Sequence, residues 1–253
     1  MPDRAPRRRD LKLAGAPECL GREPQGPLPD ELTRSRMPEL AVPGCGKVAP
    51  ARPGQAEVED AVRTLIAWAG DDPERAGLRR TPGRVAQAYG DLFAGYRADP
   101  VSLLRQGRIA TETGGQLVLL RAIRFVSFCE HHLLPFTGHA DLGYVPRHQV
   151  VGLGAIAAAV EAVARRLQIQ ERMTDELASA LVEALDPMGV AVVVRAEHQC
   201  LAARGACKAG ARLVTSRQFG CLAADQGLGR AFFDLVGAGG ASGGEPGESV
   251  RWR

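Results

Sequence analysis

Two short segments rich in cysteine and histidine constrain this chain more than any other feature. One is Cys129-Glu130-His131-His132, and the other is His198-Gln199-Cys200. Thiolate and imidazole groups are typical Zn²⁺ ligands, and a site with two thiolates and one imidazole leaves the fourth position for water. A buried cysteine is often only a small apolar core residue, but two such segments together favour a metal site. The fold is therefore expected to bring residues 129–132 and 198–200 together.

The spacing alone leaves the choice of the imidazole ligand open. Alternate residues of a strand point to the same side, so His198 and Cys200 would share a face, and so would Cys129 and His131 if their strand continued. A turn after Cys129 would instead bring His132 to the metal. A closed site with four protein ligands and a structural role is the alternative to an open catalytic site.

Composition limits the class of protein. Of the 253 residues, 45% are hydrophobic and 24% are charged, which is ordinary for a soluble globular protein. An aromatic content of 5% argues against a stacking surface for single-stranded nucleic acid. The sequence contains neither an apolar run long enough to span a membrane nor a secretory signal. We expect a cytoplasmic protein with reduced thiols that binds neither nucleic acid nor membrane.

The chain is expected to form one folded domain between two tails. Residues 1–55 contain ten prolines and no aromatic residue, so they cannot bury enough apolar surface to offset their ordering entropy. They also hold the whole positive excess, since the formal net charge is +3 and this segment has ten Lys or Arg and seven Asp or Glu. Residues 237–253 begin with a glycine-rich stretch. The folded domain is predicted over residues 56–236.

Hydrophobic periodicity predicts an α+β domain with helices packed on an antiparallel sheet. Thr81 is expected to cap a helix that has Pro82 at its first position. Helices are expected over 57–70, 81–95, 153–167, 174–185 and 225–236, and strands over 116–129, 139–145 and 190–196, with residues 133–138 as the connection between the first two strands.

Five further motifs accompany the two cysteine- and histidine-containing segments: Ala76–Arg84, Gly152-Leu153, Gln168–Thr174, Ala203-Arg204-Gly205 and Val214-Thr215-Ser216. In their order and spacing they resemble the GTP cyclohydrolase I family over residues 57–236. The resemblance implies a tunnelling fold (T-fold) with an N-terminal helical hairpin, in which subunits join their sheets into a barrel. It also implies a toroidal homodecamer whose sites are shared between neighbouring subunits.

The resemblance also implies the chemistry. Zinc would be held by Cys129, His132 and Cys200, and the imidazole ring of the guanine of GTP would be opened hydrolytically at C8. Formate leaves, the ribose rearranges and the ring closes again as 7,8-dihydroneopterin triphosphate, the first step of tetrahydrofolate and pterin biosynthesis. His131 and His198 would exchange protons with the purine nitrogens and the ribose oxygen, work that suits an imidazole with an ordinary pKa of about 6.5.

Four other residues would recognise the substrate. Glu171 would accept hydrogen bonds from the guanine N1–H and 2-amino group, a donor pair that a carboxylate matches, and Gln170 would lie beside it. Arg84 and Arg204 are the cations that remain for the triphosphate. A carboxylate in the first turn of a helix is also favoured by the helix dipole alone, so Glu171 gains its role only from the resemblance.

The sequence departs from the family where the triphosphate is expected to bind. The family usually has Ser-Lys after Gly-Leu and an arginine three residues beyond that lysine, whereas this chain has Gly154, Ala155 and Ala158. In some members a lysine also stands where this chain has Gln87. Two alternatives therefore remain beside a GTP cyclohydrolase I: a paralogue acting on a less phosphorylated purine, and a non-catalytic regulatory subunit.

Overall fold

The computed structural model describes residues 52–112 and 114–237, and those after Arg52 belong to one compact unit. The two expected tails, residues 1–55 and 237–253, lie almost entirely outside the described residues, so they stay predictions. None of the described helices is both long and apolar enough to cross a membrane.

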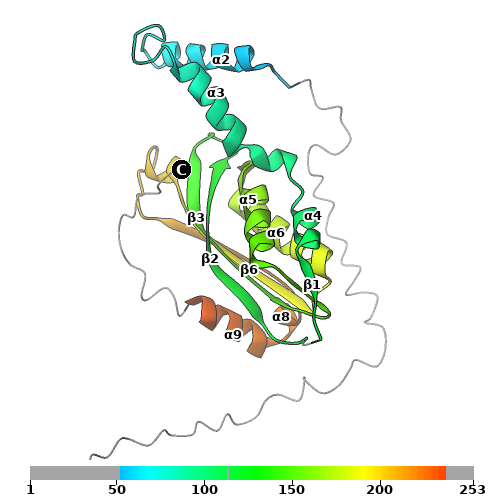
Figure 1. Ribbon diagram of the computed structural model, residues 1–253. Coiled ribbons are helices and arrows are strands. Elements are labelled where there is room, and N and C mark those ends of the chain that lie inside the picture. The colour runs from blue at the N-terminus through cyan, green and yellow to red at the C-terminus, as the bar shows by residue number, and fades with distance from the viewer. Residues whose placement is uncertain (1–51, 113, 238–253) are drawn as a thin grey trace, which may run out of the picture. The chain divides into compact units, whose positions relative to one another are not determined.

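A curled five-stranded sheet forms the centre of the fold (Figure 1). Its strand order is β5-β2-β3-β6-β7, with antiparallel pairing throughout except between β2 and β5, which are parallel. β1 and β4 form a separate antiparallel pair. The strands are β1 Arg108–Ala110, β2 Val118–Cys129, β3 Pro135–Val145, β4 Gln149–Val151, β5 Leu167–Gln168, β6 Gly189–His198 and β7 Arg212–Gly220.

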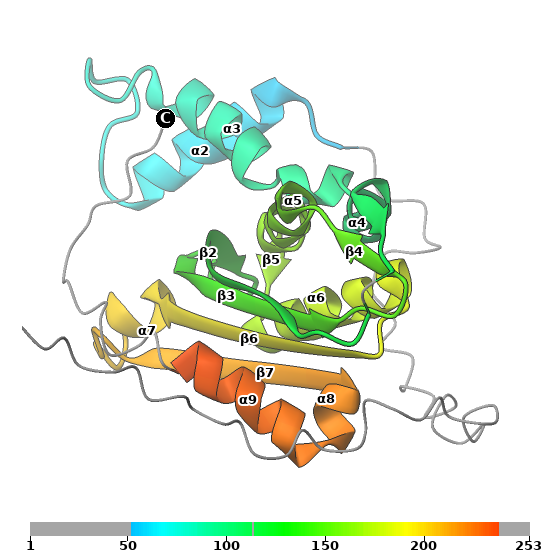
Figure 2. The same ribbon diagram turned by 60° about the horizontal axis from the view of Figure 1, so that its bottom comes forward.

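Helices cover both faces of this sheet (Figure 2). α5 and α6 pack on one face in the larger apolar core, and α8 and α9 cover the other face. The helices are α2 Gln55–Trp68, α3 Thr81–Leu92, the 3-10 helix η2 Ala94–Arg97, α4 Pro100–Gln106, α5 Leu153–Ala164, α6 Gln170–Leu185, α7 Gln199–Ala202, α8 Cys221–Ala224 and α9 Gln226–Gly237.

Strand β6 is apolar on both sides because it lies in the middle of this three-layer arrangement. Val192 and Val194 contact the core under α5 and α6, whereas Ala191 and Val193 contact Phe232 of α9 on the opposite face. Strands covered on both faces lose the apolar–polar alternation. This explains why the sequence shows a continuous apolar run here.

Strands β3 and β6 approach each other closely at Gly138, which lies opposite Ala196. A Cβ atom at residue 138 would lie 2.7 Å from the Cα atom of Ala196, so only glycine fits without moving a strand. Two residues along, Phe136 lies opposite His198. The close approach therefore holds the end of β6 against the strand that pairs with β2.

Helices α2 and α3 form an N-terminal hairpin that leaves apolar surface uncovered. No residue of α2 is buried, and Leu65 and Trp68 are 64% and 86% exposed. Exposed apolar patches on a soluble protein usually mark a contact surface.

The α+β class and the order of the main elements are confirmed, but several boundaries were wrong. Helix α6 begins at Gln170 rather than at residue 174, and β3 begins at Pro135, inside the expected connection. The N-cap of α3 is Arg80 and not Thr81. The helix expected over 153–167 ends at Ala164, because the chain turns there to add β5 beside β2.

Candidate metal centre and substrate site

A turn directly after β2 presents the first metal-binding segment. The backbone N–H groups of His132 and Leu133 both donate to the carbonyl oxygen of Cys129, at 3.3 and 2.8 Å. Leu133 closes the turn with φ at 56°, in the left-handed region. The strand therefore does not continue, and the turn brings Cys129 and His132 to the same side.

The second segment lies at the end of β6. The prediction that His198 and Cys200 lie on one strand face was wrong, because β6 ends at His198 and Cys200 belongs to the short helix α7. The change from strand to helix still directs the Cys200 thiol toward the turn after β2.

Within the described residues, ligand atoms of Cys129, His132 and Cys200 all lie within 4.8 Å of one another. The Sγ atom of Cys129 is 3.7 Å from Nδ1 of His132. A tetrahedral metal with bonds of about 2.3 Å to sulfur and about 2.0 Å to nitrogen would place these atoms about 3.5 Å apart. The distance between Cys129 and His132 therefore fits a tetrahedral metal, and the Cys200 thiol lies close enough to be a third ligand.

The electrostatics of the two thiols also suit a cation. Burial raises the pKa of the Cys200 thiol, and the neighbouring Cys129 raises it further. Two adjacent thiolates repel each other in a partly buried site, so both can be deprotonated near neutral pH only beside a positive charge. A divalent metal supplies that charge.

His131 is not one of the three converging ligand residues, although its Nδ1 atom lies 3.8 Å from Sγ of Cys129. Its side chain is 65% exposed, and its Nε2 atom lies 3.9 Å from Oε1 of Glu130. Glu130 is held in turn by Arg172 of α6, at 2.5 Å. His131 thus lies near a carboxylate, beyond hydrogen-bond distance, and stays accessible to a ligand.

His198 is the last residue of β6, two residues before Cys200. Its ring stacks on Phe136, with the ring centres 4.4 Å apart and the planes at 6°. Its Nε2 atom is 2.9 Å from the side-chain oxygen of Gln170. Burial lowers the pKa of His198, and the nearby Glu171 carboxylate opposes that shift. A neutral imidazole able to accept a proton is therefore favoured at neutral pH.

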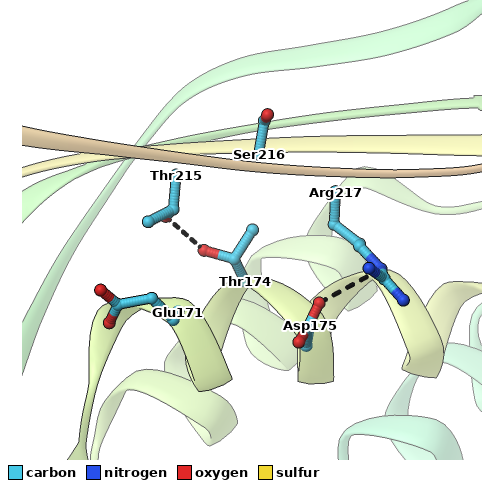
Figure 3. A pocket seen from close by; sticks show the side chains of 6 residues that line it. All are labelled: Glu171, Thr174, Asp175, Thr215, Ser216 and Arg217. Atoms are coloured by element: carbon cyan, nitrogen blue, oxygen red, sulfur yellow. Dashed lines mark hydrogen bonds and ion pairs between the residues drawn. The ribbon is translucent and has the colours of Figure 1, made fainter. Parts of the chain in front are cut away.

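Glu171 lies at one end of an open hollow of about 270 Å³ between α6 and β7 (Figure 3). Its carboxylate points away from Asp175, which pairs with Arg217 at the other end, 3.3 Å apart. Glu171 is exposed in the isolated chain and its carboxylate is therefore available to a ligand. The hollow is lined by Glu171, Thr174, Asp175, Thr215, Ser216 and Arg217.

Residues 58–237 match the family described as GTP cyclohydrolase I, and this range includes all the residues of the cluster. The chain belongs to the GTP cyclohydrolase I family. Its curated relatives carry the name GTP cyclohydrolase 1. The protein of Brucella anthropi is 51% identical over 65% of this chain and 78% of its own length. That of Allorhizobium ampelinum is 51% identical over 66% and 83%, and that of Gloeobacter violaceus is 47% identical over 74% and 87%.

The arginines that the GTP cyclohydrolase I resemblance assigns to the triphosphate are not brought together within one chain. Arg204 is exposed just after α7 and its charge acts on the Cys200 thiol. Arg84 is exposed on α3, which packs mainly against α2 and η2. A role for Arg84 at this metal centre would therefore require another subunit.

The structure also identifies residues that sequence reasoning missed. Arg172 connects the metal-binding turn to α6 through Glu130, and its Nε atom donates to the side-chain oxygen of Gln168 at 2.9 Å. Thr174 and Thr215 share a hydrogen bond of 2.6 Å beneath Glu171. Within α6, Arg172 and Glu176 stand four residues apart and pair at 3.8 Å, a spacing that the sequence does show.

Proposed function

We propose that this chain acts as a GTP cyclohydrolase I at the cluster of Cys129, His132 and Cys200. Membership of the family makes it an enzyme with GTP as substrate, which releases formate and forms 7,8-dihydroneopterin triphosphate. The paralogue and the regulatory subunit are not favoured, because relatives near 50% identity share one name. The proposal for the site is carried by the convergence of the three ligand atoms within 4.8 Å.

We propose Zn²⁺ as the metal, since two thiolates and one imidazole with an open position form a catalytic zinc donor set. When bound, zinc acts as a Lewis acid and lowers the pKa of water to about 7. His131 and His198 stand next to the metal-binding residues in the sequence and would move protons between water, the purine nitrogens and the ribose oxygen. Neither is a metal ligand in this proposal.

A turnover assay on zinc-loaded protein tests this function directly. Formate release and pterin fluorescence should both rise with GTP, and removal of zinc by a chelator should stop both. If intact, zinc-loaded protein released no formate, the proposed activity would be wrong.

Guanine recognition is proposed for Glu171. Glu171→Gln should raise KM for GTP by about tenfold to hundredfold, because a hydrogen bond to a charged group contributes about 1.5–3 kcal/mol. Asp175→Asn is the matched control, since Asp175 lines the same hollow but pairs with Arg217. Steady-state kinetics measures both variants. An equal rise of KM in the control would assign the effect to the hollow as a whole.

The predicted substrate contact of Gln170 stays a prediction.

The triphosphate is proposed to contact Arg204 and, from a neighbouring subunit, Arg84. Helix α5 contributes no side-chain cation at its first turns: Gly154 is exposed with open space around it, and Ala155 is packed against the apolar core. Weak phosphate contacts should therefore limit the affinity for GTP.

Restoring the missing cations should improve substrate binding. Ala155→Lys combined with Ala158→Arg should lower KM for GTP by about tenfold, because hydrogen bonds to phosphate oxygens are charge-assisted. Ala157→Lys is the control, because it adds a charge to a different side of α5. An unchanged KM in the double variant would show that the triphosphate is bound elsewhere.

We propose a homo-oligomer, with a decamer as the expected form and a barrel built from joined sheets. Two features support it: β7 is one of the two edge strands of the sheet, with Leu213 and Val214 40% and 56% exposed, and Trp68 is 86% exposed on α2. Unpaired edges and apolar patches are usually covered in the native state. Light scattering that gave a single 26.9 kDa chain would contradict this.

A further inference from the structure

Gln170 is a buried amide that connects three elements of the fold. It is the first residue of α6 and is 1% exposed. Its Nε2 atom lies 3.0 Å from the carbonyl oxygen of Val194 in β6 and 3.1 Å from that of Leu213 in β7. It also lies 3.1 Å from Oγ1 of Thr215. The amide is therefore surrounded by protein groups on its nitrogen side.

These neighbours fix which end of the amide faces which partner. A backbone carbonyl oxygen can only accept a hydrogen bond, so the NH₂ group of Gln170 must face Val194 and Leu213. The reverse orientation would place the amide oxygen against two other oxygens and leave a buried repulsion. The assignment follows from the hydrogen-bond network, as amide orientations in general must.

The two threonines give the same orientation independently. The hydroxyl of Thr174 donates to the backbone oxygen of Gln170, at 2.8 Å. Its single proton is thereby used, so in the 2.6 Å contact between the two hydroxyls Thr215 must be the donor. The proton of Thr215 is then used as well, so Thr215 has none to donate to an amide oxygen, and the two protons of the Gln170 NH₂ group are shared among three oxygens. The Gln170 side chain must therefore present its NH₂ group to Thr215.

The amide oxygen of Gln170 consequently faces Nε2 of His198, at 2.9 Å. Because this oxygen has no proton to give, the proton of the contact belongs to the imidazole. We infer that Gln170 is a positioning residue that holds His198 in the tautomer with its proton on Nε2, which leaves Nδ1 as the nitrogen that exchanges protons with the substrate. The hydrogen bond made by one ring nitrogen selects the tautomer of the other.

Stacking on Phe136 fixes the plane of the same ring, with the two planes at 6°. A half-turn flip of the ring would put the Cε1 carbon in the place of Nε2, lose the bond to Gln170 and leave the amide oxygen unpaired inside the protein. The lone pair of Nδ1 is thus oriented before substrate binds. The inference rests on the proposed catalytic role of His198 and adds the atom through which it acts.

Neutron diffraction of the zinc-loaded protein, exchanged into heavy water at a pH well above the ordinary imidazole pKa of about 6.5, tests the tautomer directly. A deuteron on Nε2 of His198 and none on Nδ1 is expected. A deuteron on Nδ1, alone or together with one on Nε2, would overturn the inference. This measurement needs no variant and is independent of activity.

Gln170→Leu tests the consequence for catalysis. We expect kcat to fall by about tenfold to hundredfold, as for other partners that orient a histidine, with KM for GTP within about twofold of the original. A rise of KM at unchanged kcat would mean that Gln170 contacts substrate and does not position His198, while the proposed function itself would stand. An unchanged kcat and KM would also contradict the inference.

Gln168→Leu is the matched control for loss of a buried amide. Gln168 is also 1% exposed, and its side chain bonds to Val163, Glu176 and Arg172 but not to His198. This variant should lose comparable stability and keep the deuteron of His198 on Nε2. A lost or moved deuteron in this control would show that general loosening of α6 sets the tautomer and would overturn the specific role of Gln170.

Discussion

His131→Ala is expected to lower kcat by about 10²–10⁴-fold while the protein keeps its zinc. This is the range that a positioned acid–base group contributes. His131 is 65% exposed and lies outside the group of three converging ligand atoms. Its removal should therefore leave the metal contacts of Cys129, His132 and Cys200 intact. Metal analysis by mass spectrometry, together with steady-state turnover, measures both effects on the same sample.

The adjacent His132→Ala provides the contrast. Loss of one of three protein ligands should release most of the zinc and with it the activity, because structural and catalytic sites depend on their full ligand set. The two variants thus separate metal binding from proton transfer. If His131→Ala lost the metal and His132→Ala kept it, the assignment within the pair would have to be exchanged.

Replacement of Arg195 by leucine should lower the free energy of unfolding more than replacement of an arginine in an exposed ion pair. Arg195 of β6 pairs with Asp141 of β3, whose side chain is only 6% exposed and also accepts from the backbone N–H of Ala122 at 2.9 Å. Without Arg195, a charged carboxylate would remain buried, which costs about 3–5 kcal/mol when a fully buried pair is broken. Since Arg195 is 34% exposed, water screens the pair and reduces the cost. We expect a loss of about 2–3 kcal/mol in the free energy of unfolding.

Arg105→Leu is the control for this prediction. Arg105 pairs with Glu183 at 3.1 Å, but both side chains are largely exposed, so its loss should cost no more than about 1 kcal/mol. Denaturant unfolding at equal protein concentration measures both, because assembly contributes to stability. Equal losses in the two variants would mean that burial of Asp141 has no special effect.

The local pattern of the sequence predicted the elements that have one exposed and one buried face. The helix predicted over 174–185 is an example, since Leu177, Leu181 and Leu185 of α6 are buried on one face, as its helical periodicity indicates. Helix α6 was predicted four residues too short because its first turn faces β6 and β7, and Gln170 and Glu171 are polar in sequence. Tertiary contacts, which the sequence does not display, make Gln170 a buried residue.

The candidate site was predicted in part. The pairing of the two cysteine- and histidine-containing segments followed from ligand chemistry, but the choice between His131 and His132 depended on a turn, and the turn depends on backbone bonds to Cys129. The prediction that Cys200 follows the strand periodicity of His198 was wrong, because the chain changes from β6 to α7 at Gln199. The connection of Glu130 to Arg172 spans elements distant in sequence, so no local pattern could reveal it.

Gly138 gives the metal centre a dependence on a residue that has no side chain. The strand carrying it lies between the one that ends at Cys129 and the one that leads through His198 to Cys200. A Cβ atom added at residue 138 would force β6 away from β3 and widen the distance between Cys129 and Cys200 that a metal must bridge. The spacing between β3 and β6 therefore sets how far apart the metal ligands lie. A substitution at Gly138, which is not a ligand itself, would lower the affinity for the metal.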